Sequence, residues 1–258
     1  MVQLEHNLTL TLQALAPSGN ALSPEQLAAL ELSLPLKQHE AGLKHLSFWG
    51  KILARNGKDY LVAQGCMRAA VLDSRVESDR RVCFSQDGVR WLDLAAPPPA
   101  VAQAASLLTS QLSGDPATAY TVKDAEGGRM RVTELQRLRA AVDAVTGGTA
   151  VVPARAFVAD ARRDLVANPL FAGVPYPAKL ESYLHAQGGP DGESLAADVR
   201  HTWSLHYDAA AGRTVLRSLL WPGYQFFYQV PTARAGASAW GGLYFGTGAK
   251  NSDLIFMV

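Results

Sequence analysis

Two glycines and a lysine near the end of the chain are spaced almost like a phosphate-binding loop. The run is Gly246-Thr247-Gly248-Ala249-Lys250. A phosphate loop needs its lysine directly after the glycine and at the start of a helix, where backbone N–H groups bind the phosphates. Here Ala249 separates the two, and only eight residues follow Lys250. We therefore expect no nucleotide site, and a glycine-rich turn where two backbones approach closely.

A serine between small residues is the second candidate for chemistry. Ser238 lies in Gly236-Ala237-Ser238-Ala239-Trp240, which is similar to a nucleophile elbow but lacks the second glycine. In that class of hydrolase the catalytic histidine follows the serine in the chain, whereas the last histidine here is His206. We expect Ser238 to lie in a flexible loop.

Histidines and cysteines are the remaining candidates for metal binding. His201 and His206 are five residues apart on an expected strand, so their side chains point to opposite faces. Cys66 and Cys83 lack the closely spaced companions of a zinc site, and we interpret both as small apolar residues in sheet segments. The carboxylates are scattered along the chain. The sequence therefore assigns no catalytic, cofactor-binding or metal-binding residue.

The charge composition of the chain indicates which kinds of molecule it can bind. The 258 residues include 24 Lys and Arg against 23 Asp and Glu, which gives a formal net charge of +1. Nucleic-acid binders gain affinity by neutralising phosphates, so this balance argues against DNA or RNA as the partner. Charged residues make up only 18% of the chain, and a lightly charged surface favours association with other proteins.

The sequence shows no pattern typical of a secreted or membrane-spanning protein. Two cysteines are too few for a secreted disulfide scaffold. The first twenty residues lack the basic start and continuous apolar run of a signal peptide. No segment offers roughly 20 uninterrupted apolar residues, so we predict no membrane span. These observations predict a soluble intracellular protein.

The first third of the chain contains signals for one helix and two hairpins. Ser23-Pro24-Glu25-Gln26 is a capping-box start for a helix that we expect to weaken at Pro35. From His45 the apolar period changes to two, which predicts a strand with Leu46, Phe48, Gly50, Ile52 and Ala54 on one face. Asn56-Gly57 predicts a tight hairpin turn, and Asp87-Gly88 predicts a second turn, between residues 81–84 and 89–94.

The middle of the chain reads mainly as helices and loops. Residues 97–99 are prolines, which end the sheet segment and are the only hint of an internal boundary. We predict a helix over 101–112, a polar surface loop over 117–129, and a helix that starts at the capping box of Thr133 and Gln136. Gly147-Gly148 should stop that helix. A short helix over 177–186 and a loop over 187–192 follow.

The last quarter of the chain is the clearest β region. Alternation predicts strands over 201–208, 213–220, 224–230 and 240–246, with a turn at 209–212. Hairpin-linked strands among separate helices predict an α+β fold, with antiparallel sheets and no parallel Rossmann-type sheet, in a single domain over 1–258. Aromatic residues on both faces of the strand that starts at Tyr224 are explained either by a sheet covered on both sides or by a partner protein over one side.

Three blocks of this sequence resemble the radial spoke head protein 9 family. One block is Leu216-Arg217-Ser218-Leu219-Leu220-Trp221-Pro222-Gly223. The second runs from Tyr244-Phe245-Gly246 to Leu254, followed by Phe256-Met257, and the third is Phe48-Trp49-Gly50 with Asp59-Tyr60-Leu61. The first and third blocks are also similar to the longer spoke-head proteins 4 and 6, but the chain length and the ending favour protein 9. The loops at Gln187–Arg200 and Pro231–Gly241 differ from those of the family in length and composition.

This resemblance implies a non-catalytic structural subunit of the radial spoke head in motile cilia and flagella. The neighbours it implies are spoke-head proteins of the 4 and 6 type, with further head and stalk subunits. It implies no cofactor, no small-molecule substrate, no nucleic acid and no membrane, and a cytoskeletal location in the axoneme. An unrecognised hydrolase and a peptide-binding scaffold module are the alternative functions.

Overall fold

The structure is a computed structural model of the whole chain, and it describes residues 3–4, 8–16, 19, 21–66, 80–123, 128–159, 165–186, 192–231 and 238–254. The helices of these residues are α1 (Leu8–Leu15), α2 (Pro24–Glu40), α3 (Pro99–Ser106) and α4 (Glu134–Thr149), with short 3-10 turns at Leu180–Ser182 and Leu195–Ala197. The strands are β1 (Gln3–Leu4), β2 (His45–Ile52), β3 (Tyr60–Cys66), β4 (Arg80–Ser85), β5 (Leu92–Asp93), β6 (Ala119–Lys123), β7 (Arg129–Thr133), β8 (Val151–Pro153), β9 (Phe157–Ala159), β10 (Leu165–Ala167), β11 (Tyr183–His185), β12 (Trp203–Asp208), β13 (Arg213–Ser218), β14 (Tyr224–Gln229) and β15 (Ala239–Gly246).

One large mixed sheet joins the two ends of the chain. Its strand order is β12-β13-β14-β15-β2-β3-β4-β5, and β1 pairs with the first half of β15. Along this order the neighbours within each half are antiparallel. β15 pairs in parallel with β1 and also with β2, from Tyr244 beside Gly50 to Gly246 beside Ile52. The predicted α+β class, mostly antiparallel and without a Rossmann-like arrangement, is confirmed. The parallel junction was not predicted.

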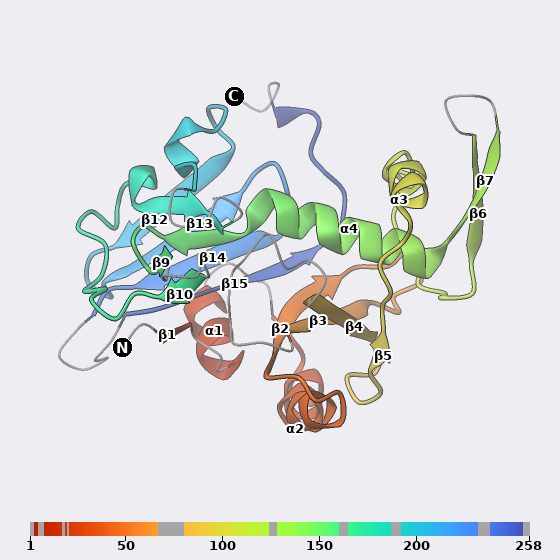
Figure 1. The fold of residues 1–258 in the computed structure, drawn as a ribbon, viewed down its shortest axis with the longest axis horizontal. Helices are drawn as coiled ribbons and strands as arrows, with labels where there is room; N and C mark the ends of the chain where they lie inside the picture. Colours follow the sequence, from red (N-terminus) through yellow and green to blue (C-terminus); the bar gives the residue numbers. More distant parts are fainter. Residues whose placement is uncertain are drawn as a thin grey trace.

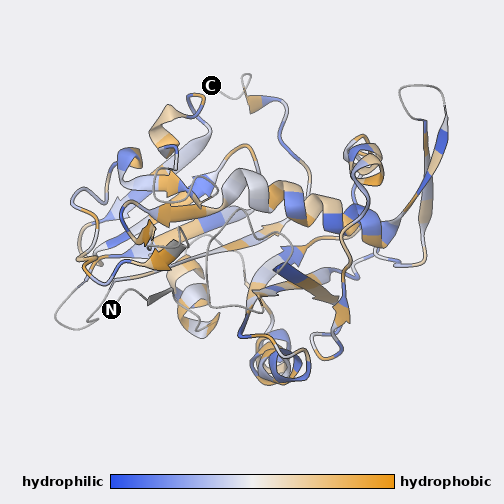
Figure 2. Cartoon of the chain, viewed as in Figure 1, coloured by the Kyte–Doolittle hydropathy of each residue, from blue (hydrophilic) through white to orange (hydrophobic). Residues whose placement is uncertain are grey.

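Helices cover both faces of this sheet (Figure 1). On one face α4 packs its apolar side, with Leu138, Val142 and Val145 fully buried, against the strands. On the other face α1 and α2 enclose a second cluster, which includes Leu30 and Phe227. The aromatic residues on both faces of β14 are therefore explained by a sheet covered on both sides within the chain. Figure 2 shows hydrophobic and hydrophilic residues alternating along α4, as its single buried face requires.

A β-bulge in β2 redirects its side chains. The register with β3 shifts between Phe48 and Gly50, so that Trp49 is the inserted residue. Before the bulge Phe48 packs in the α2 cluster; after it Ile52 packs in the α4 cluster. The prediction that the whole strand buries one face was wrong for this reason, because an inserted residue changes the face to which all later residues point.

Both predicted capping boxes are present, but both helices run further than predicted. The side chains of Ser23 and Thr133 each accept the backbone N–H of a glutamine at the third helical position, and each cap residue donates its own N–H to the side-chain oxygen of that glutamine. The first helix continues through Pro35 to Glu40, since the exposed Pro35 leaves its missing hydrogen bond on the solvent side. The second continues through Gly148 to Thr149, and Gly148 serves close packing there rather than termination.

Both predicted hairpins have their turn at the predicted place, but the turn at Gly57 is of a different type. Gly57 has φ +77° in a loop between β2 and β3, but that loop spans 53–59 and Asn56 is not in the left-handed region, so the predicted tight primed turn is wrong. Asp59 instead accepts the Ala54 N–H at 2.9 Å and closes the longer loop. At the second turn Gly88 has φ +75°, and the carboxylate of Asp87 accepts two backbone N–H groups.

Three predictions in the middle of the chain were wrong because tertiary contacts outweigh local pattern. Of residues 117–129, which were predicted to be a polar surface loop, 119–123 form β6 and Arg129 begins β7, and the buried Val122 and Val132 of these strands pack against α3. Residues 124–127 lie outside the described residues. The predicted helix over 101–112 is α3, which ends at Ser106. The predicted helix over 177–186 is a 3-10 turn followed by β11, where Tyr183 is fully buried and pairs with β8. Of the predicted loop over 187–192, residues 187–191 lie outside the described residues.

Candidate functional site

The glycine-rich loop after β15 folds back on its own strand. Gly248 N–H donates to the hydroxyl of Tyr244 at 2.8 Å, and burial raises the pKa of that hydroxyl to about 12. A side chain at Gly246 would place its Cβ 2.4 Å from the carbonyl oxygen of Pro222. The predicted close approach of backbones is confirmed. No α-helix follows Lys250 within the described residues up to Leu254, so the loop there does not have the form of a phosphate loop.

The structure separates Ser238 from the histidines. Ser238 is buried and directly precedes β15. His206 lies on β12, which is three strands away in the sheet, or roughly 14 Å at about 4.8 Å per strand. His201 lies in a turn with φ +67° rather than on the strand where it was predicted. None of the described residues form a group of three potential metal ligands.

The two cysteines lie on neighbouring strands, but they are not opposite each other. Cys66 of β3 is opposite Arg80, whereas Cys83 of β4 is opposite Ala63, and neither forms a disulfide within the described part of the chain. Burial raises the pKa of Cys83 to about 12, which leaves it an unreactive thiol at neutral pH. The interpretation of both as small residues within the sheet is confirmed.

The three sequence blocks of the resemblance meet at the parallel junction. Gly50 lies so close to β15 that a Cβ there would be 2.1 Å from the Tyr244 carbonyl oxygen. Gly223, at φ +105°, approaches the Phe245 carbonyl oxygen in the same way, with 2.2 Å between that oxygen and a Cβ. The rings of Trp49 and Tyr244 are 5.3 Å apart. The residues that carry the resemblance therefore hold the two halves of the sheet together.

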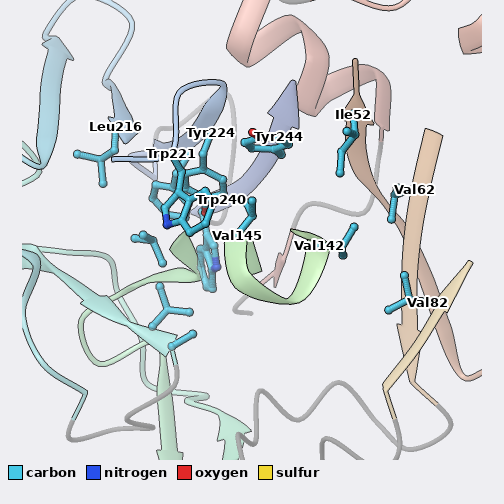
Figure 3. Close-up of a cluster of buried hydrophobic side chains, with 14 of the residues drawn as sticks. Ile52, Val62, Val82, Val142, Val145, Leu216, Trp221, Tyr224, Trp240 and Tyr244 are labelled. Atoms are coloured by element: carbon cyan, nitrogen blue, oxygen red, sulfur yellow. The ribbon is translucent and has the colours of Figure 1, made fainter. Parts of the chain in front are cut away.

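Trp221 lies at the corner between β13 and β14, as predicted. Its side chain is buried next to Tyr224 and Tyr244 and near Val145 of α4 (Figure 3). Its backbone N–H donates to Ser218 Oγ at 3.1 Å, which fixes the corner. These contacts make Trp221 part of the core.

A buried carboxylate, which the sequence did not single out, fixes the base of the β6–β7 hairpin. Glu134, the first residue of α4, is fully buried, and Tyr120 of β6 donates its hydroxyl to it at 2.5 Å. The Gly114 N–H and the Ser113 hydroxyl donate to the other carboxylate oxygen at 2.9 and 3.1 Å. Arg137 lies over the Tyr120 ring at 5.0 Å. These bonds fix the hairpin, which projects from the body of the molecule in Figure 1.

Several large apolar side chains are exposed on the described surface. Four of them lie on α2 or near β5, on neighbouring elements that Lys37 and Asp93 link by an ion pair: Leu32, Leu36, Val89 and Leu92. Others lie near the opposite end of the sheet, including Val199 and Tyr176. A contiguous group of such side chains is typical of surfaces that contact other proteins, whereas a singly exposed apolar side chain is ordinary. No helix among the described residues is long and apolar enough to cross a bilayer.

Comparison with known proteins assigns the family. The chain is 31% identical to a radial spoke head protein 9 homolog of Xenopus tropicalis. The comparison covers 97% of this chain and 98% of that protein. The homolog of Danio rerio is also 31% identical, with 98% and 99% covered. This chain belongs to the radial spoke head protein 9 family. The homolog of Mus musculus is 29% identical over 98% of the chain, and no family model matches.

Membership of the radial spoke head protein 9 family agrees with the position of the three blocks. Because the alignments span nearly the whole of both chains, the similarity includes the central helices as well as the two ends. The described part of the second block, up to Leu254, lies at the junction, and the Asn251 N–H donates to the Leu220 carbonyl oxygen at 2.8 Å. Phe256 and Met257 lie outside the described residues.

Proposed function

We propose that this chain is a non-catalytic structural subunit of the axonemal radial spoke head. In this role it is needed for assembly of the spoke head and for regulation of ciliary and flagellar motility. The observation that carries the proposal is the full-length similarity to proteins named radial spoke head protein 9 homolog. The exposed apolar side chains and the near-neutral charge are consistent with a subunit held mainly by contacts with other proteins.

The proposed neighbours are spoke-head proteins of the 4 and 6 type, with further head and stalk subunits. This part of the proposal rests on the resemblance of the Leu216–Gly223 block and the Phe48–Gly50 block to those longer proteins. The location follows from the same role, in the cytoskeleton of the cilium or flagellum. A hydrolase that uses Ser238 is a weaker candidate, because that side chain is 3% exposed and far from His206 along the sheet.

Copurification tests the proposed function. A tagged copy of the full chain is expressed in cells of its own source organism, axonemes are extracted, and the tagged complex is sized and identified by mass spectrometry. We expect spoke-head proteins of the 4 and 6 type in stoichiometric amounts. Purification of the tagged chain without any spoke-head protein, or a reproducible hydrolytic turnover that is lost in Ser238→Ala, would instead favour another function.

A further inference from the structure

The outer edge of β12 presents unpaired backbone groups. Leu219 N–H binds the carbonyl oxygen of Thr202 at 2.8 Å, which fixes the alternation of the β12–β13 ladder. Ser204, His206 and Asp208 therefore direct their N–H and C=O groups toward β13, while Trp203, Leu205 and Tyr207 direct theirs away from it. Within the described part of the chain, these outward groups make no backbone hydrogen bond.

Within the part of the chain that the structure describes, no proline, lysine or bulge protects this edge against further pairing. Natural sheets shorten or interrupt an exposed edge strand, or place proline or lysine on it. The opposite edge of this sheet follows that rule, since β5 has two residues. β12 has six residues, without proline, lysine or a bulge, and the side chains of Leu205 and Tyr207 are only half-buried. Its carboxylate, Asp208, is engaged in capping the turn at Ala210.

A hollow lies at the start of the same edge. It measures about 420 Å³ and its lining includes Leu195, Val199, Thr202 and Trp203, where Val199 is 75% exposed. The Trp203 indole N–H donates to Asp198 at 2.6 Å, and His185 contacts the same carboxylate, so this wall is fixed. The hollow is large enough to admit one apolar side chain from a segment that lies along β12.

The solvent face of the edge carries both signs of charge, with Arg213 and Arg217 on β13 and Asp208 on β12. Arg217 of β13 lies opposite Ser204, is exposed, and makes no ion pair with any residue that the structure describes. His206 is exposed on β12 at the neighbouring position. An additional strand would lie roughly 10 Å from β13, at about 4.8 Å per strand, within reach of the long arginine side chain. An acidic residue on that strand would pair with Arg217.

We propose that the outer edge of β12 binds an extended segment of another spoke-head protein, which adds one strand to the sheet. The segment directs apolar side chains toward Leu205 and Tyr207, inserts one into the hollow beside Trp203, and carries an acidic residue toward Arg217. Main-chain hydrogen bonds to Trp203, Leu205 and Tyr207 supply the recognition, as in other cases of strand addition. This inference rests on the proposed function for the source of the segment.

A matched pair of substitutions at one position tests the edge. Tyr207→Pro removes an N–H that the fold does not use, whereas Tyr207→Ala removes the same side chain and keeps that N–H. Both full-length variants and the wild-type chain are expressed in ciliated cells that lack their own radial spoke head protein 9. The amount of each in isolated spoke heads is measured by quantitative mass spectrometry, and the melting temperature of each is measured on the purified chain.

We expect the two variants to melt alike, because the fold does not use the N–H that the proline removes. The proline variant should enter spoke heads about tenfold less than the alanine variant, which corresponds to about 1.4 kcal/mol of lost binding. Equal incorporation of the two variants overturns the edge proposal alone. Absence of the wild-type chain from spoke heads overturns the proposed function.

Amide hydrogen exchange supplies a second measurement that does not depend on the proline variant folding. In the free wild-type chain the amides of Leu205 and Tyr207 should exchange quickly, and those of Ser204 and His206 slowly. In intact spoke heads all four should exchange slowly. Exchange at Leu205 and Tyr207 that is as fast in spoke heads as in the free chain overturns the edge proposal, whatever the variants do.

Discussion

Gly148 of α4 lies directly against the indole of Trp221, so closely that a Cβ at this glycine would be 2.3 Å from the indole nitrogen. The helix that covers the sheet and the corner between β13 and β14 are therefore packed through a glycine and a tryptophan. Any side chain at position 148 displaces the indole, and loss of the indole leaves a void under the helix. The stability of the two elements is coupled through this contact.

Trp221→Ala is expected to lower the free energy of unfolding by roughly 3–5 kcal/mol, the usual cost of truncating a buried large aromatic residue. The cell should then contain less folded chain, and spoke heads should contain less of it for that reason. Thermal melting and binding to spoke-head partners are measured on the same variant. Tyr176→Ala, at a side chain that is 62% exposed, is the matched control and should melt like wild type. An unchanged melting temperature with abolished binding in Trp221→Ala would mean that the tryptophan is an interface anchor.

Gly57→Val is expected to destabilise the chain through backbone strain alone. Gly57 has φ +77°, which a β-branched residue resists, and a Cβ there meets no atom within 4 Å. Steric crowding therefore does not contribute. The neighbouring Lys58→Val places the same side chain on a residue without positive φ and should melt close to wild type. Equal melting temperatures of the two variants would contradict the strain that we assign to position 57.

Local chemistry predicted the parts of the fold that are set by neighbours in sequence. The capping boxes at Ser23 and Thr133 and the turns at Gly57 and Gly88 depend on a few adjacent residues, and all four lie at the predicted positions. Only the type of the turn at Gly57 differs from the prediction, because its loop is longer. The β6–β7 hairpin was not predicted, because its apolar signal is limited to Val122 and Val132, which gain their burial from α3.

The sequence pattern did not predict which strands from distant parts of the chain pair with each other. The parallel contact of β15 with β2 joins residues from opposite ends of the chain, and no periodicity within either strand encodes it. For the same reason the sequence did not reveal that Glu134 collects donors from Tyr120, Ser113 and Gly114. Gly50, Gly223 and Tyr244 belong to the blocks that carry the resemblance, but their sequence does not reveal that Gly50 lies against Tyr244 and Gly223 against Phe245.

Glu134→Ala is expected to loosen the projecting hairpin. Removal of the carboxylate leaves the Gly114 N–H and the Tyr120 hydroxyl without this acceptor, at about 1–3 kcal/mol for each buried group that stays unpaired. The Ser113 hydroxyl keeps Thr118 Oγ1 as an acceptor at 3.0 Å. Amide exchange in β6 and β7 should accelerate more than exchange in β14. The control is Glu25→Ala, at an exposed first-turn residue of α2, which should leave exchange in the hairpin unchanged. Protection of β6 that equals wild type in Glu134→Ala would show that the carboxylate does not hold the hairpin.

Cys83 is expected to resist thiol reagents until the chain unfolds. Its pKa of about 12 places about one thiol in ten thousand in the reactive thiolate form at pH 8, and its side chain is buried. Mass spectrometry after timed alkylation of the native chain should find Cys83 unmodified, and after denaturation fully modified. Labelling of Cys83 in the native chain at the rate of an unfolded cysteine would contradict the burial described for β4.

The most direct test of the proposed function is cryo-electron tomography of axonemes from cells of the source organism in which the gene for this chain is deleted. The account predicts radial spokes whose heads are missing or incomplete, abnormal beating, and restoration of both by the full-length wild-type chain. Complete spoke heads with normal beating in the deleted cells, in the absence of any second copy of the gene, would contradict it.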